Sequence, residues 1–215
     1  MELLPYLTVV RLVAPLLIFR FPLFGILLGI LIDAYDWLFF DITIPSPEYY
    51  FYQNWDKAMD LYMFSVAFYT SLFWKDKVAR KISIIVFAMR GAGDIIFFTT
   101  GFQKILLFTP NIFETLFLFY LFYVKFSGKK ILYSSTKIIL LVLLVVTIPK
   151  MSHEYMLHVL RLQPWDLFSI GNFLNTTGVV KSYIDYIGWG IILHLLQIIT
   201  LLILVSRINT HEKQS

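Results

Sequence analysis

Four aspartates form two closely spaced pairs near the start of the chain. Asp33 and Asp36 are three residues apart, so they lie on one face of a helix. Asp56 and Asp60 are four residues apart and share a helix face in the same way. Four carboxylates brought together repel one another unless a cation or a basic group lies between them. Since Mg²⁺, Mn²⁺ and Ca²⁺ bind oxygen ligands of this kind, the spacing predicts a divalent cation site. Its expected ligands are Asp33, Asp36, Asp56 and Asp60.

A structural explanation also fits these aspartates. In it, they are solvated residues at helix ends that face different ways. The apolar residues beside Asp33 and Asp60 argue against this explanation, because a carboxylate in an apolar membrane segment needs a partner or a function.

A second group of polar residues lies in two apolar stretches that follow. Arg90 and Asp94 are four residues apart on one helix face, and Gly91 and Gly93 leave room for a neighbouring helix. If the two stretches form a hairpin that turns near Phe102, Asp94 lies at the depth of Asn111. By the same count, Arg90 lies at the depth of Glu114.

Two interpretations of this group stay open. A charge at the centre of a bilayer costs at least about 2.5–3.5 kcal/mol, so the residues either staple two helices or form a polar binding or catalytic floor. In the functional interpretation, the expected catalytic residues are Asp56, Asp60, Arg90, Asp94 and Glu114. The expected substrate-binding residues are Arg90, Asn111, Trp37 and Trp55.

The acidic spacing resembles a known family signature. The sequence reads DAYD at 33–36 and DKAMD at 56–60, and LTVVR at 7–11 precedes them. These segments resemble the DxxDGxxAR…GxxxDxxxD signature and the LTxxR element of the CDP-alcohol phosphatidyltransferase family. The resemblance covers about the first 60 residues and implies aspartates that bind a divalent metal and activate an acceptor alcohol. The chain departs from the signature at Trp37 and Tyr52, which stand where the family has glycines, and it lacks the AR pair.

The elements that must position these residues are membrane helices. Hydrophobic residues make up 59% of the 215 residues and charged residues 15%, against roughly 25% charged residues in soluble domains. So much apolar surface requires lipid as the solvent. We expect an all-α polytopic transmembrane bundle of about six spans that forms a single integral membrane domain over residues 1–215. The expected spans are Leu12–Ile32, Ala58–Trp74, Ile82–Phe102, Ile105–Val124, Ile131–Ile148 and Tyr183–Ser206.

The first expected span is irregular. Arg11 and Arg20 interrupt its apolar sequence, and Pro15 and Pro22 stand inside it. The sequence fits either one long kinked helix or an interfacial amphipathic segment followed by a helix that starts near Phe21.

The loop charges predict an orientation in the plasma or inner membrane. Lys and Arg gather in residues 75–81 and 125–130, which the positive-inside rule places in the cytoplasm together with both termini. Residues 41–57 and 150–182 then lie outside, and the second of these either re-enters the membrane or is solvated. This orientation places the aspartate pairs outside, whereas the family that they resemble works at the cytoplasmic face.

Several functional classes are excluded or disfavoured. The chain has no cysteine, which rules out disulfides, thiolate nucleophiles and cysteine–zinc sites. It also lacks an HExxH motif, which disfavours a zinc hydrolase, and it has no P-loop. No basic tract with interleaved aromatics is present, so no nucleic-acid partner is expected. Three hypotheses remain. The first is a membrane-embedded enzyme that acts on a lipid or lipid-linked phosphate with a divalent cation. The second is a cation- or proton-coupled transporter or channel, expected as a homo-oligomer, and the third is a structural membrane subunit.

Overall fold

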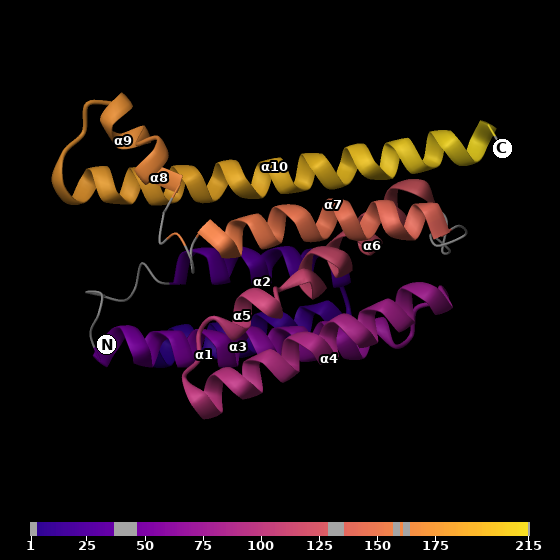
Figure 1. Ribbon diagram of the computed structural model, residues 1–215, viewed down its shortest axis with the longest axis horizontal. Helices are drawn as coiled ribbons and strands as arrows, with labels where there is room; N and C mark the ends of the chain where they lie inside the picture. Colours follow the sequence, from indigo (N-terminus) through magenta and orange to yellow (C-terminus); the bar gives the residue numbers. More distant parts are fainter. Residues whose placement is uncertain (1–3, 37–46, 129–135, 157–159, 161–163, 215) are drawn as a thin grey trace.

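The computed structural model describes residues 4–36, 47–128, 136–156, 160 and 164–214, and every regular element within them is a helix. The longest helices run side by side along the long axis of the molecule (Figure 1). In chain order, the elements are α1 (Leu4–Val13), η1 (Ala14–Phe19), α2 (Pro22–Asp36), α3 (Pro47–Ser71), α4 (Lys77–Thr100), α5 (Ile105–Phe108), α6 (Ile112–Ser127), α7 (Thr136–Tyr155), α8 (Pro164–Leu167), α9 (Ile170–Phe173) and α10 (Gly178–Gln214).

Three helical segments of the described chain are long and apolar enough to cross a membrane. They are Lys77–Thr100, Ile105–Ser127 and Val180–Ile208. An all-α structure with helices long and apolar enough to span a membrane is therefore confirmed for the described residues, and the count of six spans stays a prediction.

The N-terminal residues form a helical hairpin. Residues Leu12–Ile32 are not one continuous helix, because the chain reverses at Arg20 and Phe21, whose amides both donate to the Leu17 carbonyl. A Cβ on Gly25 would overlap the backbone of Ile18, so η1 and α2 pack at backbone distance. Of the two alternatives for this region, a helix that starts near Phe21 is confirmed, since α2 begins at Pro22, where proline fits a first helical turn.

Helices α3 and α4 form an antiparallel pair with a defined register. Asp76 ends the turn between them by capping α4, its Oδ1 accepting from the amides of Val78 at 2.9 Å and Ala79 at 3.0 Å. Two contacts then fix the register: the hydroxyls of Ser71 and Ser83 are 2.6 Å apart, and the rings of Phe68 and Phe87 stack at 4.2 Å. The paired residue numbers add to 154 and 155, so the register places Asp60 level with Asp94.

Helix α6 is the centre of the bundle. It packs against α2, α3, α4, α7 and α10, and all its residues from Ile112 to Tyr120 are buried. A helix that is apolar on every face suits such a position. The chain breaks at Thr109 and Pro110 before α6, and Gly93 of α4 makes room for this break, because a Cβ there would overlap the Thr109 side chain.

Residues 150–182, which were expected to lie between two spans, include two short helices and parts of both neighbouring helices. The segment 150–182 was expected to begin after Pro149, but α7 continues through this proline to Tyr155. Short helices α8 and α9 then fold against the first turns of α10 (Figure 1). Residues 157–159 and 161–163 lie outside the described residues.

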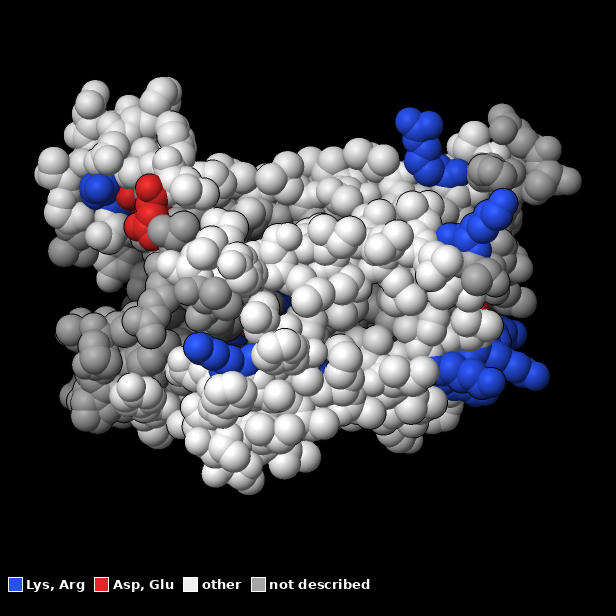
Figure 2. Space-filling view, viewed as in Figure 1, with Lys and Arg blue, Asp and Glu red and all other residues white. Residues whose placement is uncertain are grey.

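Positive charge gathers at one end of the molecule. Figure 2 shows most of the visible Lys and Arg side chains at the end where α3 passes into α4 and where α6 ends. Residues 75–81, which hold three Lys and one Arg, form that passage. The start of α1 and the end of α10 lie at opposite ends of the long axis (Figure 1).

Candidate functional site

Arg11 lies at the centre of the four aspartates. The helical hairpin brings this α1 residue against the end of α2, and α3 packs against both. The guanidinium is 5% exposed, so its charge depends on these partners. Its ion pairs are Nη1 to Asp33 Oδ1 at 2.6 Å, Nη1 to Asp36 Oδ2, Nη2 to Asp60 Oδ1 at 3.0 Å and Nη2 to Asp56 Oδ1 at 3.5 Å.

Lys57 supplies a second positive charge to the cluster. Its Nζ lies 2.7 Å from Asp56 Oδ2 and 3.2 Å from Asp60 Oδ2. Four carboxylates and two cations leave a formal charge of −2 if every group is ionised. A net charge inside a bundle is costly, so protons or a bound cation are needed to balance it. We call Arg11, Asp33, Asp36, Asp56, Lys57 and Asp60 the charged cluster.

Asp36 is the most enclosed member of the charged cluster. Its side chain is buried and accepts from Arg11 and, at 2.9 Å, from the Tyr52 hydroxyl. Asp36 is the last residue of α2, beyond the expected span, and burial raises the pKa of its carboxyl to about 7. Tyr52, which replaces a glycine of the family signature, therefore has a structural role here as a hydrogen-bond donor.

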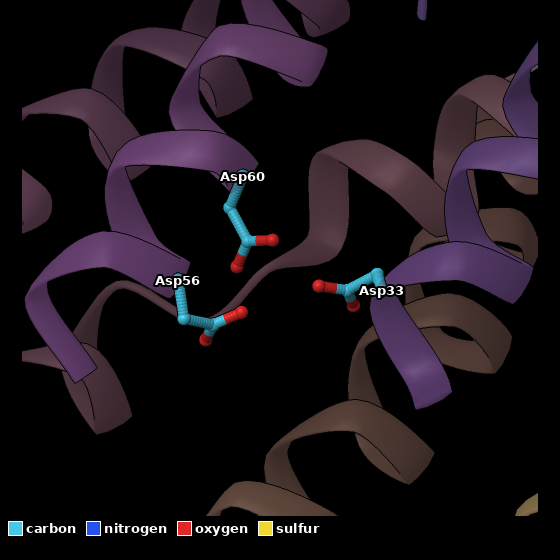
Figure 3. Close-up of side chains that lie close together, drawn as sticks. All are labelled: Asp33, Asp56 and Asp60. Carbon is cyan, nitrogen blue, oxygen red and sulfur yellow. The ribbon is translucent and has the colours of Figure 1, made fainter. Parts of the chain in front are cut away.

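Three of the four aspartates lie within the reach of a single cation. Asp33 of α2 faces Asp56 and Asp60 of α3 (Figure 3), and one carboxylate oxygen from each lies within 4.8 Å of the others. Ca²⁺ and Mg²⁺ bind oxygens at about 2.0–2.6 Å, so two ligands of one ion lie at most about 5 Å apart. The all-oxygen donor set and the spacing both fit such an ion. Asp36, the fourth expected ligand, is outside this group, and Arg11 and Tyr52 contact its two oxygens.

The second polar group, which consists of Arg90, Asp94, Asn111 and Glu114, does not pair by equal depth in the membrane as expected. Arg90 forms the expected ion pair with Asp94, Nε to Oδ1 at 3.1 Å, and its Nη1 donates to the Thr109 carbonyl at 3.1 Å. Asn111 instead donates to Glu114 Oε2 at 2.8 Å, and its own side-chain oxygen caps α6. Asn111 and Glu114 are therefore engaged with each other at the start of α6.

Asp94 is buried with incomplete hydrogen bonding. Its side chain is 0% exposed, and neither carboxylate oxygen accepts a hydrogen bond from any residue in the described part of the chain. The α3–α4 register places it level with Asp60, and both Asp60 and Lys57 lie within electrostatic range of it. The charged cluster thus continues into the α4 pair Arg90–Asp94.

The two tryptophans expected to bind substrate have different outcomes. Trp55 packs on the charged cluster: the Arg11 guanidinium lies 5.5 Å from the centre of its ring, and its Nε1 donates to the Thr8 hydroxyl at 3.1 Å. Trp37 lies outside the described residues.

Sequence reasoning gave no site role to Arg11, Lys57 or Tyr52. Arg11 counted as an interruption of the first span and as part of the LTVVR segment, and Lys57 lay within residues 41–57, which were expected outside the membrane. A charge inside an apolar segment is a signal that could have identified Arg11, whereas the hydrogen bond from Tyr52 to Asp36 depends on how α2 and α3 pack.

Comparison with protein-family models, with curated protein sequences and with solved structures finds no match to this chain. The resemblance to the CDP-alcohol phosphatidyltransferases, which rests on the acidic spacing, stays a prediction.

Proposed function

We propose that the chain is a membrane-embedded enzyme that acts on a lipid or lipid-linked phosphate with a divalent cation. The observation that carries this proposal is the placement of one oxygen each from Asp33, Asp56 and Asp60 within 4.8 Å. These oxygens belong to a cluster whose formal charge of −2 matches one divalent ion. A divalent cation bound there supplies charge stabilisation to a phosphate group.

The chain's own residues have separate roles in this proposal. Arg11 and Lys57 hold Asp56 and Asp60 at fixed positions through short ion pairs. Asp33 has the most exposed side chain of the four, at 32%, so it is the carboxylate that a substrate hydroxyl reaches first. In group transfer to such a hydroxyl, the phosphorus–oxygen bond to the leaving group breaks, a new one forms to the acceptor oxygen, and the acceptor's proton passes to a carboxylate.

The charge distribution supports an orientation for the enzyme. The end rich in Lys and Arg faces the cytoplasm in this proposal (Figure 2). The charged cluster lies where α2 ends and in the first half of α3, which is toward the opposite end, so it faces outward (Figure 1). Because the N-terminal hairpin returns to its starting end, the N-terminus then lies outside and only the C-terminus is cytoplasmic (Figure 1). In this proposal the N-terminus therefore differs from the expectation that both termini are cytoplasmic.

A melting experiment on the full chain in detergent tests the cation site. Millimolar Mg²⁺, Mn²⁺ or Ca²⁺ should raise the unfolding temperature, because an ion that binds only the folded state stabilises it by mass action. Asp56→Asn should abolish the rise. Asp166→Asn, which changes an exposed aspartate on α8, should leave it intact. An unfolding temperature of the parent that does not respond to any of the three ions contradicts the proposal.

A transporter is a second candidate function, which the state of Asp94 favours. A buried carboxylate without hydrogen bonds from the described residues, next to an arginine and near a second acid, is a typical carrier of a proton or a cation. Purified protein in liposomes should then take up protons or a cation under an imposed gradient, and Asp94→Asn should stop the uptake.

A further inference from the structure

A groove opens between the start of α3 and the end of α4. Its volume is about 460 Å³, a size typical of small-molecule sites. The groove is lined by amides and one cation on one hand and by aromatic rings on the other. The lining includes Gln53, Asn54, Gln103, Lys104, Phe97 and Phe98.

The groove leads directly to the charged cluster. The α3–α4 register that pairs Ser71 with Ser83 also places Gln53 level with Gly101. On α3, Gln53 is three and four residues before Asp56 and Lys57, so the three share a helix face. The groove therefore lies one helical turn beyond the charged cluster, at the same end of the bundle.

The α4 side of the groove likewise lies one helical turn beyond the Arg90–Asp94 pair. Phe97 and Phe98 follow Asp94 by three and four residues, so they continue its face toward the helix end. A molecule in the groove is thus in contact with both helices that carry the cluster.

The lining matches an amphipathic anion. Lys104 is exposed and forms no ion pair with any residue that the structure describes, so its charge is available to a ligand. Side-chain amides of Gln53 and Gln103 can donate to phosphate oxygens. Phe98 is 39% exposed and offers an apolar surface to an acyl chain. A lysine, amides and aromatic rings in one groove fit the phosphate headgroup and the first chain carbons of an anionic phospholipid.

We infer that this groove binds the phosphate-bearing headgroup of an anionic lipid and presents it to the charged cluster. The inference deepens the proposed function and rests on it for the chemistry, but the binding step itself needs no cation. Lys104 provides the charge recognition, and the amides of Gln53 and Gln103 fix the orientation of the headgroup.

Binding of short-chain lipids to the full chain in detergent tests the inference. Dihexanoyl phosphatidic acid should bind in the presence of EDTA, and Lys104→Gln should weaken it at least about tenfold, because a charge-assisted contact is lost. Gln53→Leu should weaken it less, by roughly threefold to fivefold. Lys125→Gln, an exposed lysine in the last turn of α6, is the matched control and should bind like the parent.

Three results would overturn the inference. If dihexanoyl phosphatidylcholine binds with equal affinity, the groove does not recognise net negative charge. If inorganic phosphate binds with equal affinity, the groove does not recognise the lipid part of the ligand. If the Lys104→Gln variant binds the lipid like the parent, the lipid does not bind in this groove. These binding measurements are made without divalent ions, so they are independent of the melting experiment. If the groove binds lipid but divalent ions do not change the unfolding temperature, only the proposed function is refuted. A cation response without lipid binding refutes the groove alone.

Discussion

The two halves of the molecule treat buried charge differently. From α1 to α4, buried ionisable side chains from different helices contact one another, as in the ion pairs of Arg11 with Asp36 and Asp60. From α7 onward, Asp185 is the buried charged residue among those described. Its oxygens accept from the Ser169 hydroxyl and the Gly171 amide, both at 2.8 Å, which ties α9 to α10.

This difference separates a structural use of a buried charge from a functional one. Asp185 is satisfied by neutral donors close to it in the chain, so the fold explains it fully. The charged cluster draws residues from three helices, leaves a formal charge of −2 and adjoins a carboxylate without hydrogen bonds from the described chain. Such surplus charge has no structural benefit, since apolar residues of similar volume would pack as well.

Removal of Arg11 should have the largest effect on stability. Arg11→Leu leaves four carboxylates with Lys57 alone, and a broken buried pair typically costs about 3–5 kcal/mol of unfolding free energy. Asp185→Asn, the matched change in the other half, should cost clearly less, because an amide still accepts one hydrogen bond. Thermal unfolding in detergent measures both. Equal losses for the two variants contradict the distinction between the halves, and adding Asp36→Asn and Asp60→Asn to Arg11→Leu should recover part of the loss.

Removal of Arg90 should cost nearly as much. Arg90→Leu leaves Asp94 buried without its ion pair, so we expect a loss of about 3 kcal/mol and poor expression. The double variant Arg90→Leu/Asp94→Asn should recover folding, because no uncompensated charge remains. Retained cation response, lipid binding and transport in this double variant would show that the pair is only a structural staple. A double variant that folds but has lost these properties supports a binding or catalytic role for the pair.

A third expected effect is a pH dependence of stability from Asp36. The folded protein keeps the proton on Asp36 up to a pKa of about 7, whereas the unfolded chain loses it near the ordinary value of about 3.9. The folded state thus binds more protons between these values, so its stability should fall as the pH rises from about 4 to about 7. Asp36→Asn should reduce this slope in unfolding temperatures measured across that range. Identical slopes for parent and variant would show that Asp36 does not titrate there.

Much of the bundle could be predicted from apolar run lengths. The spans expected at Ile82–Phe102 and Tyr183–Ser206 lie within α4 and α10 apart from one end that differs by two residues, because lipid requires long uninterrupted helices there. The spacing of the aspartates also placed the two members of each pair on one helix face, since residues three or four apart share a face. It did not determine that Asp33 of α2 would face Asp56 and Asp60 of α3.

The reversal in the N-terminal hairpin could not be predicted with the same rules. Pro22 is equally compatible with a kink inside one helix and with the first turn of a new one. The choice depends on the packing of Gly25 against Ile18, which is a contact between elements. The reversal brings Arg11 to the end of α2, so its ion-pair partners could not be predicted either.

The pairing of the second polar group was missed for a related reason. The depth count assumed a continuous helix after Phe102, but the chain breaks at Thr109 and Pro110. The break makes Asn111 the cap of α6, so its side chain is used locally and does not reach α4.

The position of Arg11 has a consequence for how the protein is made. During synthesis Arg11 leaves the ribosome before the four aspartates that it pairs with, which follow 22, 25, 45 and 49 residues later. The arginine can pair with the first two within the N-terminal hairpin, but Asp56 and Asp60 arrive only with α3. A nascent chain that ends before α3 therefore holds an incomplete ion cluster at the membrane, and insertion of α3 is the event that completes the first half of the molecule.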